Sequence, residues 1–295
     1  MTRAIIIAAF LVLAACGEAE QSTSMESAPC TDASRACVTE AAMSYIEALW
    51  AGDGANARLH PSVRRTHNGG DNAEDGAEAI QATFAGEGIA AHKNLRLVVY
   101  EAKGDVFALW IVEGPERSAH VAERIRVAEG LVTEIEVFVV LDDRPFTEIP
   151  EHWPTDSENL SNHGCGDPVR ACLYDVANSY LDALVAADGS DVKFAPNVRR
   201  TQNGGRVQEG EDELRASVSR ERLAFRRNFR LFADEEAGQV MALWVTGHDL
   251  PDAKFTAHVI ERLRIEDGLI SEIGVFYPRD MGTLEGVSGW PDEAP

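Results

Sequence analysis

The sequence is short of positive charge. It contains 27 Lys and Arg residues against 49 Asp and Glu residues, which gives a formal net charge of −22 at pH 7. A chain this acidic repels phosphate backbones and anionic lipid headgroups. We therefore expect no nucleic-acid partner, and no attachment to a membrane through a basic patch.

Long hydrophobic runs and common catalytic motifs are also missing. The longest apolar run, Ala4–Ala15, has 12 residues, which is too few to cross a bilayer as a helix. No glycine-rich phosphate loop and no Gly-x-Ser-x-Gly nucleophile elbow occur, and no two histidines have the spacing of metal ligands. We expect no metal and no other cofactor.

The short apolar run is typical of an export signal. Its end, Leu13-Ala14-Ala15-Cys16, resembles the lipobox of bacterial lipoproteins, which implies that Cys16 becomes the lipidated N-terminus. Gly17 follows, rather than the Asp of an inner-membrane retention signal, so we expect a periplasm-facing lipoprotein of the outer membrane. Residues 1–16 are then the signal and 17–28 a flexible tether. An ordinary secretory signal with a chance cysteine is the alternative.

The most informative feature that is present is an internal repeat. The stretch from Cys30 to Phe138 recurs from Cys165 to Phe276. The repeat predicts domain 1 over residues 29–141, a linker over 142–163, domain 2 over 164–279 and a tail over 280–295.

Cysteine is scarce, and the four cysteines other than Cys16 lie at matching positions of the two repeats. Once Cys16 is set aside, each half has one Cys-x6-Cys pair. Exported proteins fold in an oxidising compartment, so disulfides are the default. Because each copy should carry its own bridge, we expect Cys30–Cys37 and Cys165–Cys172. A zinc site made from all four cysteines is the alternative, but the short Cys-x2–4-Cys spacing is absent.

Each copy begins with helices and ends with strands. An amphipathic helix opens it, a polar strand ends at Asn-Gly-Gly, and a second helix follows at Glu74–Ala91 or Glu211–Phe225. Short turns then connect three or four strands, which indicates an antiparallel meander. This order predicts an α+β class with two tandem cone-shaped domains, each with N-terminal helices packed on a curved antiparallel sheet.

The meander ends in ERIRVAEGLVTEIEVF in one copy and ERLRIEDGLISEIGVF in the other. Together with the helix end YLDALVAADGSDV, this order resembles the nuclear transport factor 2-like fold and its SnoaL-like group. The resemblance covers both copies and implies a pocket between the helices and the concave sheet face. Proteins of this group include isomerases, cyclases and non-enzymatic binding modules, so the fold does not decide the function. It also implies that two such domains pair through their sheets, here as an intramolecular pseudo-dimer.

One carboxylate interrupts the apolar stripe of a strand in each copy. Glu123 shares its face with aliphatic residues, and Glu261 matches it in copy 2. Burial raises the pKa of a carboxyl group and suits it to general acid or base chemistry. The alternative is a structural ion pair with Arg96 or Arg230 across the sheet, or a position between the two domains.

Other polar and aromatic residues recur around the expected pocket. Tyr45 lies on the apolar stripe of the first helix, and in ketosteroid-isomerase-like proteins such a tyrosine donates to a substrate oxyanion; a core tyrosine is the alternative. His67 is the titratable candidate near the mouth, because copy 2 has Gln202 there. The candidate ligand-binding residues are Trp110, Thr66, Asn68, Tyr180, Trp244 and Glu261. Thr66 and Asn68 can alternatively stabilise the hairpin.

Two classes of function remain open from the sequence. The first is a lipid-anchored binding module for a small apolar or aromatic molecule, or for a protein partner. The second is a cofactor-independent isomerase, cyclase or lyase that transfers a proton in the pocket of domain 1 through Glu123, Tyr45 and His67. If Glu123 and Tyr45 point into one enclosed cavity, that geometry favours the enzyme over the binding module.

Overall fold

A computed structural model describes residues 34–68, 72–114, 116–149, 163–221, 223–250, 253–277 and 279–280. The predicted signal, Cys16, the tether, Cys30 and most of the linker and tail lie outside these residues. Within them, no helix is long and apolar enough to cross a membrane.

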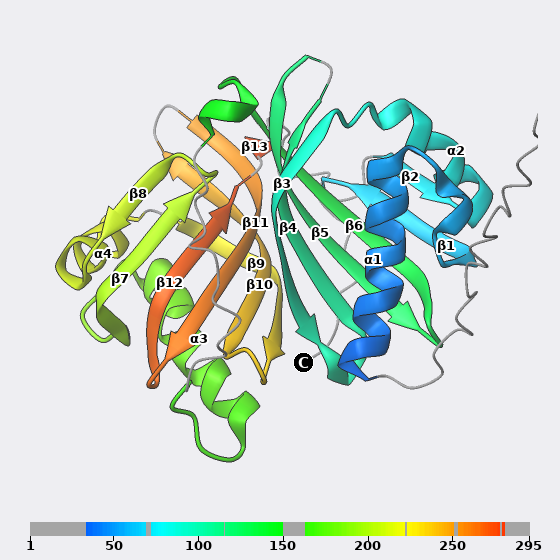
Figure 1. Cartoon of the computed structure of the whole chain (residues 1–295). Helices are drawn as coiled ribbons and strands as arrows, with labels where there is room; N and C mark the ends of the chain where they lie inside the picture. Colours follow the sequence, from blue (N-terminus) through cyan, green and yellow to red (C-terminus); the bar gives the residue numbers. More distant parts are fainter. Residues whose placement is uncertain are drawn as a thin grey trace, which may run out of the picture.

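Over the residues that the structure describes, the first domain has two α-helices and six strands (Figure 1). They are α1 (Arg35–Ala51), β1 (Leu59–His67), β2 (Asn72–Asp75), α2 (Ala77–Glu87), β3 (Ala91–Tyr100), β4 (Asp105–Glu113), β5 (Ser118–Ala128) and β6 (Leu131–Asp142).

The second domain repeats this order. Its elements are α3 (Val169–Ala186), β7 (Phe194–Gln202), β8 (Arg206–Glu209), α4 (Glu211–Val218), β9 (Leu223–Asp234), β10 (Gln239–Leu250), β11 (Ala253–Glu266), β12 (Leu269–Phe276) and β13 (Arg279–Asp280). The tandem α+β organisation is therefore confirmed, with the helix, hairpin, helix and meander on which the nuclear transport factor 2-like resemblance rests.

Local sequence sets the ends of α1. The hydroxyl of Ser34 accepts a hydrogen bond from the backbone N–H of Cys37, which satisfies one free donor of the first turn. Gly52 ends the helix in the left-handed conformation, with φ 65°. Between them, the helix buries the apolar stripe that contains Tyr45 and Leu49 against the sheet.

The sheet in each domain is mixed rather than wholly antiparallel. The strand order is β2-β1-β6-β5-β4-β3 in domain 1 and β8-β7-β12-β11-β10-β9 in domain 2. The meander strands are antiparallel as expected, but β1 pairs with β6, and β7 with β12, in parallel. In each domain the chain passes through the second helix and the meander before its last long strand pairs with the first. The periodicity of the sequence does not predict this pairing between distant strands.

The second helix is shorter than expected in both domains. Glu74 belongs to β2, where it pairs with Arg65 of β1, and Gly76 at φ 93° separates the strand from α2. In domain 2, α4 ends at Val218, and Phe225 lies in β9, paired with Gly247 of β10. Strand pairing in both places replaces the predicted helical ends.

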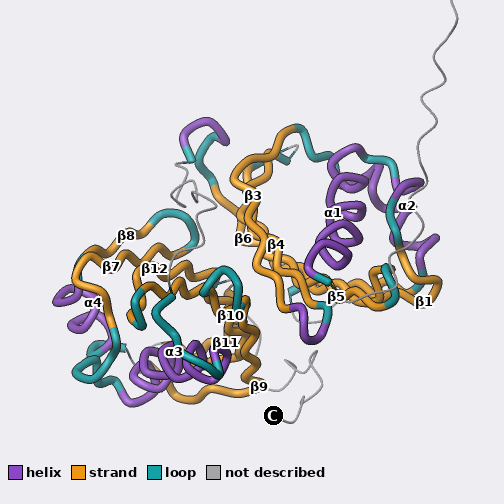
Figure 2. Tube along the Cα trace, turned by 60° about the horizontal axis from the view of Figure 1, so that its bottom comes forward, coloured by secondary structure: helices purple, strands orange, loops and turns teal. Residues whose placement is uncertain are grey.

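The two sheets pack against each other through the faces that point away from the helices (Figures 1 and 2). Alternate residues of each strand enter different cores: Val106, Ala108 and Trp110 face the helices of domain 1. The intervening residues Phe107 and Leu109 pack with Phe232 and others of domain 2. The predicted pseudo-dimer is thus the observed arrangement.

Buried ion pairs cross this interface. Arg230 of β9 donates to both carboxylate oxygens of Glu136 in β6, at 2.8 and 3.2 Å. Arg35 makes a two-bond contact with Asp234 at 2.7 and 2.8 Å, and Asp234 also accepts from the backbone N–H of Val99. Arg230 therefore stabilises the interface between the two domains.

The expected bridge of domain 2 is present. Cys165 and Cys172 form a disulfide with Cα atoms 5.7 Å apart. Cys37 is also disulfide-bonded.

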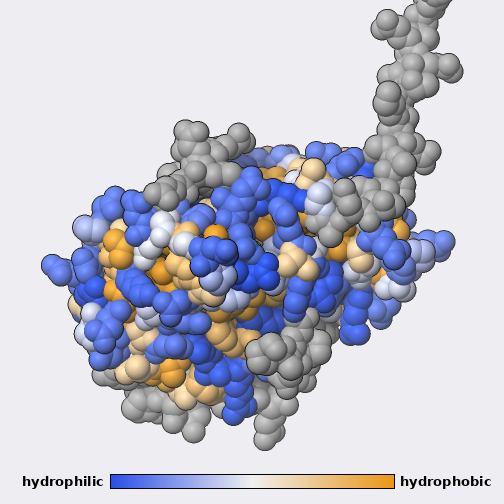
Figure 3. Space-filling model, turned by 90° about the horizontal axis from the view of Figure 1, so that it is seen from below, coloured by the Kyte–Doolittle hydropathy of each residue, from blue (hydrophilic) through white to orange (hydrophobic). Residues whose placement is uncertain are grey.

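Figure 3 shows hydrophilic residues over much of one face of the molecule, with smaller hydrophobic patches between them.

Candidate functional site

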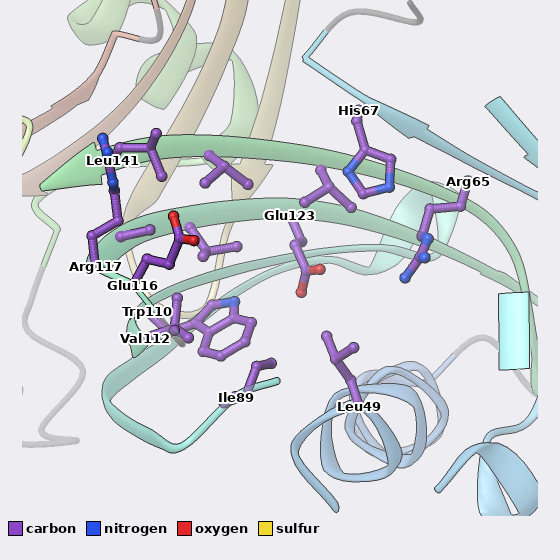
Figure 4. A pocket seen from close by; sticks show the side chains of 15 residues that line it. Leu49, Arg65, His67, Ile89, Trp110, Val112, Glu116, Arg117, Glu123 and Leu141 are labelled. Atoms are coloured by element: carbon purple, nitrogen blue, oxygen red, sulfur yellow. The ribbon is translucent and has the colours of Figure 1, made fainter. Parts of the chain in front are cut away.

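A cavity of about 620 Å³ lies between the helices and the inner sheet face of domain 1. Most of its wall is aliphatic or aromatic, and charged residues stand at both ends (Figure 4). The lining residues are Leu49, Arg65, His67, Ile89, Trp110, Val112, Gly114, Glu116, Arg117, Ala119, Val121, Glu123, Val137, Val139 and Leu141. This volume is in the range of small-molecule sites.

Glu123 reaches into the middle of this cavity from β5 (Figure 4). The residue is only 1% exposed, and its Oε1 accepts a hydrogen bond of 3.2 Å from the hydroxyl of Tyr45. Tyr45 is fully buried on α1 and stands behind the carboxylate rather than in the cavity wall. Glu123 therefore lies on the helix-facing side of the sheet, which is one of the two positions that the sequence left open.

Arg65 supplies the positive charge beside this pair. Its guanidinium donates to Glu74 at 2.5 Å and to the hydroxyl of Thr83 at 2.5 Å. Burial opposes the charge, but the hydrogen bond to Glu74 and the neighbouring Tyr45 raise the pKa of Arg65. Burial also raises the pKa of Tyr45 well above its ordinary value, with the Glu123 carboxylate adding to the effect and Arg65 opposing it. Tyr45 thus remains a neutral hydrogen-bond donor.

His67 lines the cavity at the end of β1, and its Nε2 lies 3.7 Å from Glu74. Thr66 points to the other side of this strand and is not among the lining residues. Asn68, at φ 44°, accepts a hydrogen bond from the backbone N–H of Val139 through its side chain. His67 therefore lies at the cavity, whereas the side chain of Asn68 connects the end of β1 to β6 through a hydrogen bond.

Trp110 forms an aromatic wall of the cavity. It is 2% exposed, and its ring meets the edge of Trp50 with centroids 5.6 Å apart. Trp50 in turn stacks on His92 at 3.5 Å. These contacts fix the orientation of Trp110, so its surface is preorganised toward the cavity.

Domain 2 keeps the same buried unit. Tyr180 donates to Glu261 at 3.2 Å, Arg200 lies beside them, and Trp244 is 2% exposed. Burial raises the pKa of Glu261 to about 7, although Arg200 and Tyr180 oppose the rise. One partner differs, because Arg200 donates to the neutral Gln208 where Arg65 binds Glu74.

The two domains differ more at the cavity wall. Val139 lines the cavity of domain 1, whereas its counterpart in domain 2 is Tyr277 (277 − 139 = 138, the offset of Phe276 from Phe138). Tyr277 is 8% exposed and packs in the core with Tyr180 and Trp244. The larger side chain therefore takes up space on the helix-facing side of the second sheet.

Several cavity residues were not singled out from the sequence as pocket residues. Leu49 comes from α1 and Ile89 from the loop between α2 and β3. Leu141, which is 60% exposed, lies with Glu116 and Arg117 at one side of the cavity (Figure 4). The alternation of Val63, Arg65 and His67 along β1 was the signal that Arg65 shares the side of His67. Within the described parts of the chain, no group of three or more His, Cys, Asp or Glu side chains can hold a metal ion.

Residues 31–139 and 167–276 each match the model of a protein family described as a domain of unknown function, DUF8021. The chain belongs to this family. The two matches coincide with the two structural domains of this chain, each of which has its own buried Tyr–Glu pair. A comparison with curated proteins finds no match.

Three solved structures that are similar to this chain each cover 37% of it. A candidate polyketide cyclase from Xanthomonas campestris pv. campestris is 19% identical, with 37% of this chain and 93% of that chain covered and a TM-score of 0.33. An LEH-like epoxide hydrolase from M. tuberculosis is 14% identical over 37% and 84%, with a TM-score of 0.32. An NTF-2 like protein of unknown function from Burkholderia xenovorans is 15% identical over 37% and 86%, with a TM-score of 0.32.

Proposed function

We propose that domain 1 binds one small, largely apolar molecule in the cavity beside Trp110. The observation that carries this proposal is an aliphatic and aromatic wall of suitable volume around one buried carboxylate, Glu123. Apolar walls supply affinity by removing ligand surface from water, and a few polar groups fix orientation.

Calorimetric titration of the purified chain with naphthalene tests the proposal. We expect saturable binding with one site per chain. Absence of binding by naphthalene and by its hydroxyl derivatives would refute a small-molecule site, and a stoichiometry of two would refute its restriction to domain 1.

A second candidate is proton transfer on a bound molecule. The Tyr45–Glu123 hydrogen bond supports it, because a neutral donor and a carboxylate beside a cavity are the groups that acid–base catalysis uses. In D₂O, the carbon-bound hydrogens beside the carbonyl of 2-tetralone should exchange faster with the protein than with its Glu123→Gln variant, as followed by NMR. Equal rates would leave only the binding function.

We also propose that the chain is exported and lipidated at Cys16. The sequence Leu13-Ala14-Ala15-Cys16 supports this, as does the Cys165–Cys172 disulfide, since such bridges persist in oxidising compartments. Expressed with its own N-terminus in a bacterium, the protein should fractionate with the outer membrane, and Cys16→Ser should release it. Unchanged fractionation of the variant would refute the anchor.

A further inference from the structure

The indole N–H of Trp110 is a buried donor that the fold does not use. Among the residues that the structure describes, Trp110 Nε1 finds no hydrogen-bond partner, although the residue is 2% exposed. A buried donor without an acceptor costs about 1–3 kcal/mol. The cost is removed if a molecule in the cavity presents an acceptor to it.

The strand register places this donor near Glu123. Glu123 of β5 lies opposite Ala108 of β4, and Trp110 follows two residues later on the same face. Such diagonal neighbours are about 7–8 Å apart between Cα atoms, within reach of aromatic and long side chains. Figure 4 shows the indole nitrogen on the edge of the ring that faces Glu123.

The two groups have opposite hydrogen-bonding character. An indole N–H only donates, whereas an ionised carboxylate only accepts, with about four acceptor positions on its two oxygens. Tyr45 donates to one oxygen of Glu123, so this hydrogen bond leaves acceptor capacity toward the cavity. A hydroxyl group is the small group that accepts from one neighbour and donates to another at once.

We infer that the cavity of domain 1 recognises an alcohol or phenol on an apolar ring skeleton, with its oxygen between Trp110 Nε1 and Glu123. This inference rests on the proposed ligand-binding function and specifies its ligand class. Tyr45 holds the carboxylate, and Trp50 holds the indole plane, so both contacts are preorganised. The surrounding wall of Leu49, Val121 and Val137 accepts the rings.

Three probes of nearly equal size separate ring binding from hydroxyl recognition. 2-Naphthol both donates and accepts, 2-methoxynaphthalene only accepts, and naphthalene does neither. By calorimetry at pH 7.5, we expect 2-naphthol to bind about 10-fold or more tightly than naphthalene, because hydrogen bonds to charged groups are the stronger kind. 2-Methoxynaphthalene should lose most of this advantage, because it cannot donate to Glu123.

A matched pair of variants assigns the contact. Trp110→Phe keeps an aromatic wall and removes the N–H, so it should weaken 2-naphthol about 5-fold or more and change naphthalene less than 2-fold. Trp244→Phe makes the same change at the counterpart in domain 2, whose Nε1 likewise has no partner in the described part of the chain. It should leave both affinities unchanged. Circular dichroism checks that each variant is folded.

The outcomes distinguish this inference from the function on which it rests. Equal affinities for naphthalene and 2-naphthol would overturn hydroxyl recognition while leaving an apolar binding site in place. Loss of naphthalene and 2-naphthol affinity by the same factor in Trp110→Phe would also overturn it, since the indole would then act only as a wall. Should Trp110→Phe fail to fold, the comparison of 2-naphthol with 2-methoxynaphthalene on the unaltered protein still decides. No binding by any probe would refute the proposed function itself.

Discussion

The two domains share a buried Tyr–Glu–Arg unit but differ in what surrounds it. Tyr45 and Glu123 in domain 1 have the same 3.2 Å hydrogen bond as Tyr180 and Glu261 in domain 2. A cavity adjoins the first pair, with Val139 in its wall, whereas the bulkier Tyr277 packs into the core of the second domain. A buried polar unit that recurs in both halves is therefore compatible with a purely structural role, and the wall decides whether a ligand can reach it.

The interface gives a second asymmetry. Arg35 binds Asp234, whereas its repeat counterpart Arg170 (170 − 35 = 135) lies over the ring of Tyr100, which stands where domain 2 has Asp234 (234 − 100 = 134). The two equivalent arginines thus have different partners in the opposite domain. The duplicated halves have become complementary parts of one unit rather than two interchangeable copies.

The interface should respond most strongly to mutation. Arg230→Met leaves Glu136 buried with one fewer cation, and such a loss typically costs about 3 kcal/mol of unfolding free energy. Lys193→Met is the control, because its pair with Asp175 is partly solvent-exposed and worth less than about 1 kcal/mol. Urea unfolding measures both, and equal losses would contradict a strong interface contribution from Arg230.

The buried carboxyl of domain 2 should make stability depend on pH. The pKa of Glu261 is about 7 in the folded protein against an ordinary value of 4.5, so its stabilising contribution is complete below about pH 4.5 and is lost as the pH rises through 7. The shift corresponds to about 3 kcal/mol. Between pH 4.5 and 8, the unfolding free energy of Glu261→Gln should therefore rise relative to that of the unaltered protein by up to this amount. Parallel pH profiles in urea would contradict the raised pKa.

Copying the wall of domain 2 into domain 1 should remove the site. Val139→Tyr introduces the larger residue where the cavity offers space, so we expect naphthalene affinity to fall by about 30-fold, which corresponds to about 2 kcal/mol. The thermal midpoint should change little, because the ring enters a cavity rather than a filled core. Val207→Tyr, at an exposed position of β8, is the matched control. Calorimetry giving full affinity in Val139→Tyr would show that the ligand binds elsewhere.

Replacement of Glu123 and replacement of Glu261 should affect ligand affinity to different extents. Glu123→Gln preserves size and removes the charge, and we expect about a 10-fold loss of 2-naphthol affinity, or about 1.4 kcal/mol. Glu261→Gln should leave the affinity unchanged within about 2-fold. Negligible effects from both substitutions would mean that the carboxyls serve only the fold.

Much of the architecture was predictable because the sequence contains an internal repeat. Strand alternation placed Glu123 on an apolar face but left open whether that face meets the helices or the other domain, and the stripe on the first helix predicted the burial of Tyr45. Local patterns could not give the parallel pairing of β1 with β6, nor the contact between Arg230 and Glu136, because both depend on how distant segments meet. The cavity itself depends on residues such as Val139 and Leu141 at the end of a strand, where a single change of side-chain volume alters the wall.

The location of a bound phenol is the most direct test of a ligand site in domain 1. A crystal structure of the chain soaked with 6-bromo-2-naphthol locates the ligand through the anomalous signal of its bromine. We expect one site, in the cavity of domain 1, with the hydroxyl oxygen within hydrogen-bond distance of Trp110 Nε1 and of the Glu123 carboxylate. Bromine beside Glu261, between the two domains, or equally in both domains would contradict it.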